Sequence, residues 1–138
     1  MATRQKEIII EATPEQTWAA VCDVGAVHTR LTPGYVVATH IDGDNRWLTF
    51  PNGVKLREKI ITIDEDARRL AYAVVEGGSN PLIFHHATFQ VFAEGTNHSR
   101  LVWITDFLPH ERAEEIHLRM ARGIMAMKET IEAEQSHG

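Results

Sequence analysis

From Tyr35 to Leu108, hydrophobic residues fall in short runs of about five to ten residues, each ended by a turn signal. The runs occupy residues 35–41, 46–50, 54–63, 70–76, 82–92 and 100–108, separated by DGDN, PNG, DEDARR, GGSNP and AEGTNHS. Asn-Gly between two such runs is the strongest short-range hairpin signal. Six consecutive strands joined by tight turns predict an antiparallel meander.

The chain before this meander predicts one strand and two short helices. Residues 6–12 (KEIIIEA) are a short run dominated by β-branched side chains, which is typical of a strand. The TPEQ segment at residues 13–16 offers a threonine N-cap, a proline for the first helical position and a glutamine for a capping box. We therefore expect a helix over residues 14–23. Residues 23–34 predict a second short helix that a Pro-Gly pair ends.

After Pro109 the hydrophobic period becomes that of one long helix. Its apolar residues recur at spacings of three and four and form a single stripe: Ala113, Ile116, Met120, Ile124, Met127 and Ile131. Glutamates crowd the start of this helix, where the helix dipole favours them, and also its end, where it does not. We therefore expect the last turns to fray.

These elements predict an α+β fold of the helix-grip type. A strongly bent, seven-stranded antiparallel sheet wrapped around the C-terminal helix would bury all the apolar stripes at once, with the two short helices following the first strand. Such an arrangement leaves a cavity between sheet and helix, which is a natural small-molecule site. The alternative is a cone-shaped fold of the nuclear-transport-factor type, which places its longer helices before the strands. A chain of 138 residues fits one domain spanning residues 1–138.

Composition narrows the possible partners. The formal net charge of −5, with no basic block, argues against nucleic acid, and no Lys/Arg-rich amphipathic stretch indicates an anionic membrane. The single cysteine, Cys22, rules out an internal disulfide and fits a reducing compartment. The apolar run near the N-terminus is too short for a signal peptide or a membrane-spanning helix. We expect a cytoplasmic protein without membrane insertion, as a monomer or homodimer.

Several segments together resemble a known superfamily. These are EATPEQTWAAVCDVGA, LTPGYV, VKLREKIITIDEDARRLAY, ATFQVFAEG and SRLVWITDFLP, followed by Gly123 and MAMK in the last helix. In this order they resemble the START-like (SRPBCC) superfamily, in its polyketide cyclase/dehydrase branch, over nearly the whole chain. The resemblance implies the helix-grip fold. It leaves the function open, because the superfamily includes aromatase/cyclases, lipid carriers and hormone receptors.

Glu58 is the most informative polar residue. It shares the alternation of the apolar residues in 54–63, so its carboxylate should face the interior, and the resemblance also implies a glutamate here. A buried carboxylate needs a partner, and Tyr72 and His85 on neighbouring strands are the candidates. This group could perform acid–base catalysis, with Glu58 and His85 exchanging protons and Tyr72 orienting the substrate. It could equally orient a polar group of a ligand, or be purely structural.

The adjacent residues His85 and His86 suggest a metal site, but strand geometry argues against it. Successive side chains of a strand point to opposite faces, so the two rings cannot both bind one metal. His85 shares the alternation of Phe89 and should face inward, where the superfamily commonly has a tyrosine, and His86 should face outward. His85 could also be a hydrogen-bonded structural histidine. The other histidines are scattered and match no metal motif, so we expect no metal and no cofactor.

The remaining candidates are apolar or aromatic residues predicted to line the cavity, although core packing alone could explain each of them. They are Phe89, Trp103, Thr105, Phe107, Met120, Ile124 and Met127, with Trp47 beside the PNG turn as a possible entrance residue. The leading hypothesis is a protein that binds a hydrophobic or aromatic small molecule. The alternatives are a polyketide cyclase or dehydratase that uses Glu58 and His85, and an interaction adaptor that uses the fold as a scaffold.

Overall fold

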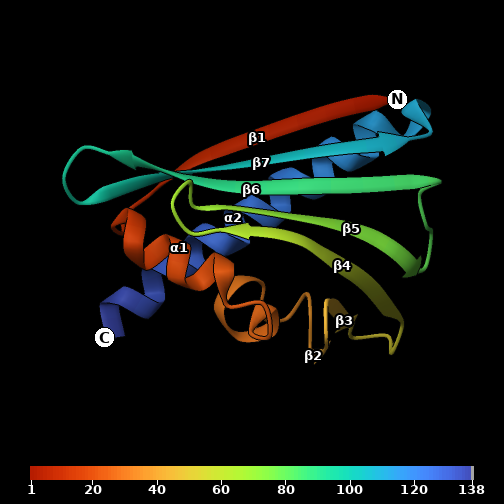
Figure 1. Cartoon of the computed structure of the whole chain (residues 1–138), viewed down its shortest axis with the longest axis horizontal. Coiled ribbons are helices and arrows are strands. Elements are labelled where there is room, and N and C mark those ends of the chain that lie inside the picture. Colours follow the sequence, from red (N-terminus) through yellow and green to blue (C-terminus); the bar gives the residue numbers. More distant parts are fainter. Residues whose placement is uncertain (138) are drawn as a thin grey trace.

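The computed structural model of this chain describes residues 1–137, which form an antiparallel sheet, short helical segments and a long C-terminal helix (Figure 1). The strands are β1 (Ala2–Ile10), β2 (Ala38–Asp42), β3 (Asn45–Thr49), β4 (Lys55–Asp64), β5 (Arg69–Gly77), β6 (Phe84–Glu94) and β7 (His98–Leu108). The helical segments are α1 (Pro14–Cys22), the π-helical turn η1 (Val27–Leu31), the 3-10 turn η2 (His110–Arg112) and α2 (Ala113–His137).

The sheet has the order β1-β7-β6-β5-β4-β3-β2, so the first strand of the chain pairs with the last. Strands β2 to β7 follow one another as the predicted meander, and α2 comes after them. This confirms the predicted α+β helix-grip fold with seven strands. The cone-shaped alternative is wrong, because the long helix follows the strands instead of preceding them.

Three elements differ from the predicted boundaries. β1 begins at Ala2 because its first half pairs with β7, starting at Ala2 opposite Phe107, although hydrophobic residues mark only its second half. The second short helix is reduced to the single turn η1. β2 begins at Ala38, later than predicted, because the N–H groups of Tyr35 and Val36 bond to the Thr32 carbonyl in a turn.

The ends of the helices depend on specific polar contacts. The predicted capping box of α1 is present, with Thr13 Oγ1 accepting from the Gln16 N–H at 3.1 Å and Gln16 Oε1 accepting from the Thr13 N–H at 2.9 Å. α2 continues to His137, and two of its late glutamates have partners, since Glu134 forms an ion pair of 2.7 Å with Arg30 and Glu132 accepts the Glu11 N–H at 2.8 Å. Fraying of the last turns stays a prediction. No helix within residues 1–137 is long and apolar enough to cross a membrane.

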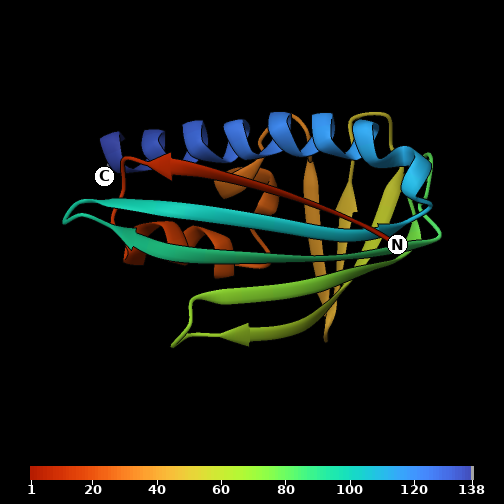
Figure 2. The same ribbon diagram turned by 90° about the horizontal axis from the view of Figure 1, so that it is seen from above.

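The sheet is sharply bent, and β4 is where its register shifts. The pairing of β4 with β5 shifts between Arg57 and Glu58 and again between Ile60 and Thr62. Such bulges increase local twist and re-aim side chains. Figure 2 shows the result, with β2 and β3 running across the direction of β6 and β7. The bend gives the sheet a concave face on the side of α2.

The core lies between this concave face and α2. The predicted stripe of α2 is buried at Ile116, Met120, Ile124, Met127 and Ile131, as expected from its spacing. The helix lies close to β1 at one edge of the sheet and to η1. The middle strands are farther from its backbone, and this is where the cavity described next is found.

Candidate functional site

A cavity of about 560 Å³ lies between the concave face of the sheet and α2. The sheet contributes a mixed wall of polar and aromatic side chains, and α2 contributes methionines and the backbone at Gly123. The lining includes Arg46, Leu56, Glu58, Tyr72, His85, Phe89, Trp103, Thr105, Arg119, Met120 and Met127. Most of the remaining lining comes from η1, the turn after it and β3, with aliphatic side chains at Val27, Leu31, Val36 and Leu48.

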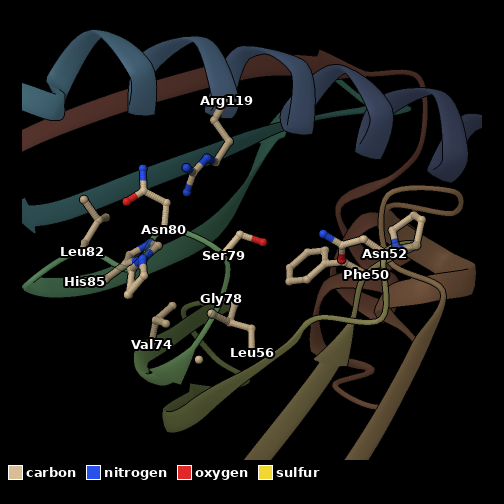
Figure 3. A pocket seen from close by; sticks show the side chains of 13 residues that line it. Phe50, Asn52, Leu56, Val74, Gly78, Ser79, Asn80, Leu82, His85 and Arg119 are labelled. Atoms are coloured by element: carbon tan, nitrogen blue, oxygen red, sulfur yellow. The ribbon is translucent and has the colours of Figure 1, made fainter.

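A second pocket of about 530 Å³ adjoins this cavity and is lined by residues 77–82 and by the turn at Phe50 (Figure 3). The two pockets share Phe50, Leu56, His85 and Arg119. Figure 3 shows Arg119 reaching from α2 toward the side of the pocket that holds His85. We call the second pocket the vestibule, since these shared residues form its boundary with the cavity.

The predicted inward carboxylate of Glu58 is buried, and its partner is Arg46. Arg46 Nε donates to Glu58 Oε1 at 2.8 Å, Nη2 lies 2.7 Å from the same oxygen in an ion pair, and the two side chains are only 5 and 6% exposed. The residues lie opposite each other on β3 and β4. The Arg46 guanidinium also lies 5.5 Å from the centre of the Tyr72 ring. The cavity wall therefore contains a buried ion pair.

Sequence reasoning missed Arg46 and named Tyr72 and His85 as partners of Glu58. All three line the same cavity as Glu58, but within residues 1–137 only Arg46 bonds to its carboxylate. A signal was available, because Arg46 shares the alternation of Leu48, which is buried. Only the pairing of β3 with β4 identifies the two charges as partners.

Tyr72, Phe89 and Trp103 form a row of aromatic rings across β5, β6 and β7. The ring centres are 6.1 Å apart for Tyr72 and Phe89 and 4.9 Å apart for Phe89 and Trp103, with interplanar angles of 24 and 22°. Burial, helped by the negative charge of Glu58, raises the pKa of the Tyr72 phenol far above its usual range, so the hydroxyl keeps its proton. The row therefore ends in a neutral hydroxyl beside the ion pair.

Trp103 is also held from the side of the helix. A side-chain carbon at Gly123 of α2 would lie 3.0 Å from Cζ3 of the Trp103 ring. Glycine at this position lets the indole pack directly against the helix backbone. The close approach fixes one wall of the cavity.

The two histidines lie on opposite sides of the sheet, as strand alternation predicts. His85 lines the cavity and the vestibule, whereas His86 lies beside Asp106, with 3.9 Å between Nδ1 and the carboxylate. Burial, together with the smaller effect of the positive charges of Arg119 and Arg112, lowers the pKa of His85 to about 4. His85 is therefore neutral near pH 7. Within residues 1–137, no cluster of His, Cys, Asp and Glu side chains could hold a metal ion.

The structure separates the other predicted lining residues into two groups. Phe89, Trp103, Thr105, Met120 and Met127 line the cavity. Phe107, Ile124 and Trp47 do not. Phe107 packs in the core beside Met120 and Ile116, Ile124 belongs to the main core, and Trp47 lies on the opposite face, with the Arg57 guanidinium 5.8 Å from its ring centre.

Because the ion pair is buried, we expect substitutions in it to change the free energy of unfolding. Glu58→Gln removes one partner and leaves the Arg46 charge buried without a counter-charge, so we expect it to lower the free energy of unfolding by about 3 kcal/mol. The double variant with Arg46→Met and Glu58→Leu replaces both charges by apolar groups and should be close to wild type. Urea unfolding measures both. A loss of unfolding free energy in the double variant as large as that in Glu58→Gln would contradict this account.

Because the pKa of His85 is lowered, we expect this residue to make the stability of the protein depend on pH. The folded protein resists protonating His85 until about pH 4, whereas the unfolded chain protonates it near pH 6.5. Stability from His85 is therefore complete above about pH 6.5 and is lost as the pH falls toward 4, in total about 3 kcal/mol. We expect His85→Gln to reduce the loss of stability measured by urea unfolding between pH 7 and 4.5. His86→Gln is the matched control, and equal changes in both variants would count against the burial of His85 as the cause.

Comparisons with known proteins support the architecture. The chain has a TM-score of 0.85 and 20% identity to an uncharacterized protein from Bacillus thuringiensis, covering 94% of this chain and 98% of that one. It has a TM-score of 0.77 and 21% identity to norcoclaurine synthase from Thalictrum flavum, solved in complex with dopamine and hydroxybenzaldehyde, covering 99 and 87% of the two chains. These likenesses show the fold.

A third similar structure is the di-domain ARO/CYC protein BexL of the BE-7585A biosynthetic pathway. Its TM-score is 0.83 at 14% identity, and the match covers 96% of this chain and 47% of that one. A comparison with curated protein sequences gives no match. The model of one family, described as polyketide cyclase / dehydrase and lipid transport, matches residues 1–132. The chain therefore belongs to the polyketide cyclase / dehydrase and lipid transport family.

Proposed function

We propose that this protein binds a hydrophobic or aromatic small molecule in the cavity between the sheet and α2. The observation that carries the proposal is the cavity itself, whose volume of about 560 Å³ is in the range of small-molecule sites. Its lining is mainly apolar and aromatic, with a few polar side chains at defined places. Such a composition is typical of sites that bind a ligand's body by apolar contact and orient it by a few polar contacts.

The vestibule supports a route for the ligand into this cavity. It adjoins the cavity at Phe50, Leu56, His85 and Arg119, and its outer part consists of the segment 77–82. Leu56 is only partly buried at this boundary, so its side chain could move aside at lower cost than a core residue. We infer that a ligand enters between Leu56 and Arg119.

The ion pair favours an orienting or structural role for Glu58 over proton exchange. Arg46 contacts Oε1 through both Nε and Nη2, so the carboxylate of Glu58 already has a permanently positive partner within the chain. His85, with a pKa of about 4, is neutral near pH 7 and offers one ring nitrogen as donor and the other as acceptor. These groups suit the recognition of a polar group on an otherwise apolar ligand.

Binding can be tested with a variant that fills the entrance. Fatty acids, polyketides and aromatic metabolites are screened by thermal shift and native mass spectrometry. A ligand at 100 times its Kd should stabilise the wild type by about 2.7 kcal/mol, which corresponds to a rise in Tm of several degrees. Leu56→Trp should abolish this rise, because the indole occupies the boundary between vestibule and cavity.

The matched control is Ile61→Trp, which adds the same side chain at an exposed position on the same strand. This variant should keep the ligand-induced rise in Tm. A rise that is equal in both variants would place the ligand elsewhere. The absence of any ligand-induced rise across the whole panel would contradict the proposed function.

A second candidate function is a cyclase or dehydratase acting on a polyketide-like substrate. It is favoured by the common location of Glu58, Tyr72 and His85, which all line the cavity. In this reading Glu58 and His85 exchange protons with the substrate and Tyr72 orients it. Turnover by the wild type that is lost in a folded His85→Ala variant would support the enzyme over the binding protein.

We also infer a cytoplasmic location and a monomer or homodimer built from one domain. The single cysteine supports a reducing compartment. Size-exclusion chromatography with light scattering would determine the oligomeric state.

A further inference from the structure

The outer face of the sheet, on the side away from α2, carries exposed apolar side chains at the two register shifts (Figure 2). Each shift leaves one residue without a partner on the neighbouring strand, Val75 in β5 and Ile61 in β4. These side chains are 45 and 51% exposed, and Phe84 at the start of β6 is 41% exposed. None of the three lines the cavity or the vestibule. Because a bulge re-aims its extra side chain, these apolar groups gather on the outer face, where such a patch marks a contact surface.

A row of four paired residues crosses the same face from β4 to β7. Lys59 pairs with Ala73, Ala73 with His86, and His86 with Asp106. Each of them directly follows a residue that lines the cavity, so all four side chains point outward. Lys59 is exposed and forms no ion pair within residues 1–137, and the Asp106 side chain is 39% exposed. The row is therefore positive at β4 and negative at β7, with about 14 Å between its ends.

This distribution of charge is complementary to itself. The strands β4, β5, β6 and β7 lie side by side in this order (Figure 1). A second copy can lie face to face on them, related by a twofold axis that runs parallel to the strands between β5 and β6. Its β7 then lies over β4, and its β6 lies over β5. Lys59 of each copy lies over Asp106 of the other, so opposite charges meet twice in the complex.

The apolar side chains follow the same symmetry. Val75 of one copy lies over Phe84 of the other, because the register of β5 with β6 places the two residues at one level. Ile61 lies over the half-buried Ile104, since the pairing across β5 and β6 leads from the bulge in β4 to this residue. At the centre, the small side chain of Ala73 lets two bent sheets approach each other. The longer charged side chains span the wider gap at the flanks.

We propose that the outer face of β4 to β7 is the interface of a twofold homodimer, held by two reciprocal ion pairs between Lys59 and Asp106 around the exposed apolar side chains. Twofold dimers are by far the commonest oligomers of soluble proteins, and their interface is one patch that must complement itself. The cavity lies on the concave face, so the dimer does not cover it. The interface is therefore independent of the proposed binding function.

The test measures the dimer by sedimentation velocity over a range of protein concentrations. At high concentration the wild type should sediment as a species of about twice the chain mass of 15.6 kDa. Lys59→Glu places like charges opposite each other at two points, so it should raise the dissociation constant of the dimer about tenfold or more. Lys55→Glu is the matched control, since it makes the same charge change on β4 at an exposed position beyond the level of the end of β7. This control should leave the dissociation constant unchanged.

A charge exchange tests the pairing of the two residues directly. Lys59→Glu combined with Asp106→Lys reverses both ends of the row, so opposite charges face each other again. The dissociation constant should then return to within about threefold of the wild-type value, because the two sites are coupled. Circular dichroism verifies that each variant is folded. A ligand-induced rise in Tm should be the same in Lys59→Glu as in the wild type, which separates the interface from the ligand site.

Four outcomes would overturn the interface. A wild type that stays monomeric at the highest concentration would leave this face to a partner of another kind. A dimer that is unchanged in Lys59→Glu would place the contact elsewhere on the molecule. Equal weakening in Lys59→Glu and Lys55→Glu would assign the effect to net charge. A folded charge-exchange variant that remains as weakly associated as Lys59→Glu would show that the two residues do not pair.

Discussion

The structure depends on one geometric constraint, namely that a single helix must cover the concave face of a seven-stranded sheet. Strands lie about 4.8 Å apart, so seven of them span about 29 Å, whereas a helix with its side chains is about 10 Å wide. The register shifts in β4 accompany a sheet that curves toward α2, and η1 fills part of the remaining side. Helix and sheet still do not meet in the middle, and the cavity is the space that remains.

The buried charges of the cavity wall are tolerated because they pair with each other. Arg46 and Glu58 line the cavity but are only 5 and 6% exposed, so each charge depends on the other as its partner. Their ion pair joins β3 to β4 beside the point where the register of β4 with β5 shifts. The ion pair and the adjacent aromatic row of Tyr72, Phe89 and Trp103 form the sheet side of the cavity wall.

Much of this architecture could be predicted from the sequence, because it rests on local periodicity. The alternation along β4 and β6 placed Glu58 and His85 inward, and the spacing of three and four predicted the buried stripe of α2. Arg46 was missed because a charged residue in a short strand is normally read as exposed, and only the pairing of β3 with β4 identifies its partner. Phe107 and Ile124 face inward as expected from the strand and helix periods. Whether an inward residue contacts the core or the cavity depends on the bend of the sheet. No pattern within a short stretch of sequence shows which residues will contact each other across the bend.

The central claim is that the cavity beneath α2 is the ligand site, and the three tryptophan indoles provide a direct measurement. Trp18 Nε1 donates to Glu65 at 2.6 Å, Trp47 lies on the outer face, and Trp103 lines the cavity. Titration of the 15N-labelled protein with 2-naphthol as an aromatic probe, followed by 1H–15N correlation spectra, should shift the Trp103 indole resonance in a saturable manner and leave that of Trp18 nearly unchanged. Saturable binding that leaves the Trp103 resonance unmoved, or shifts all three indoles alike, would contradict the account.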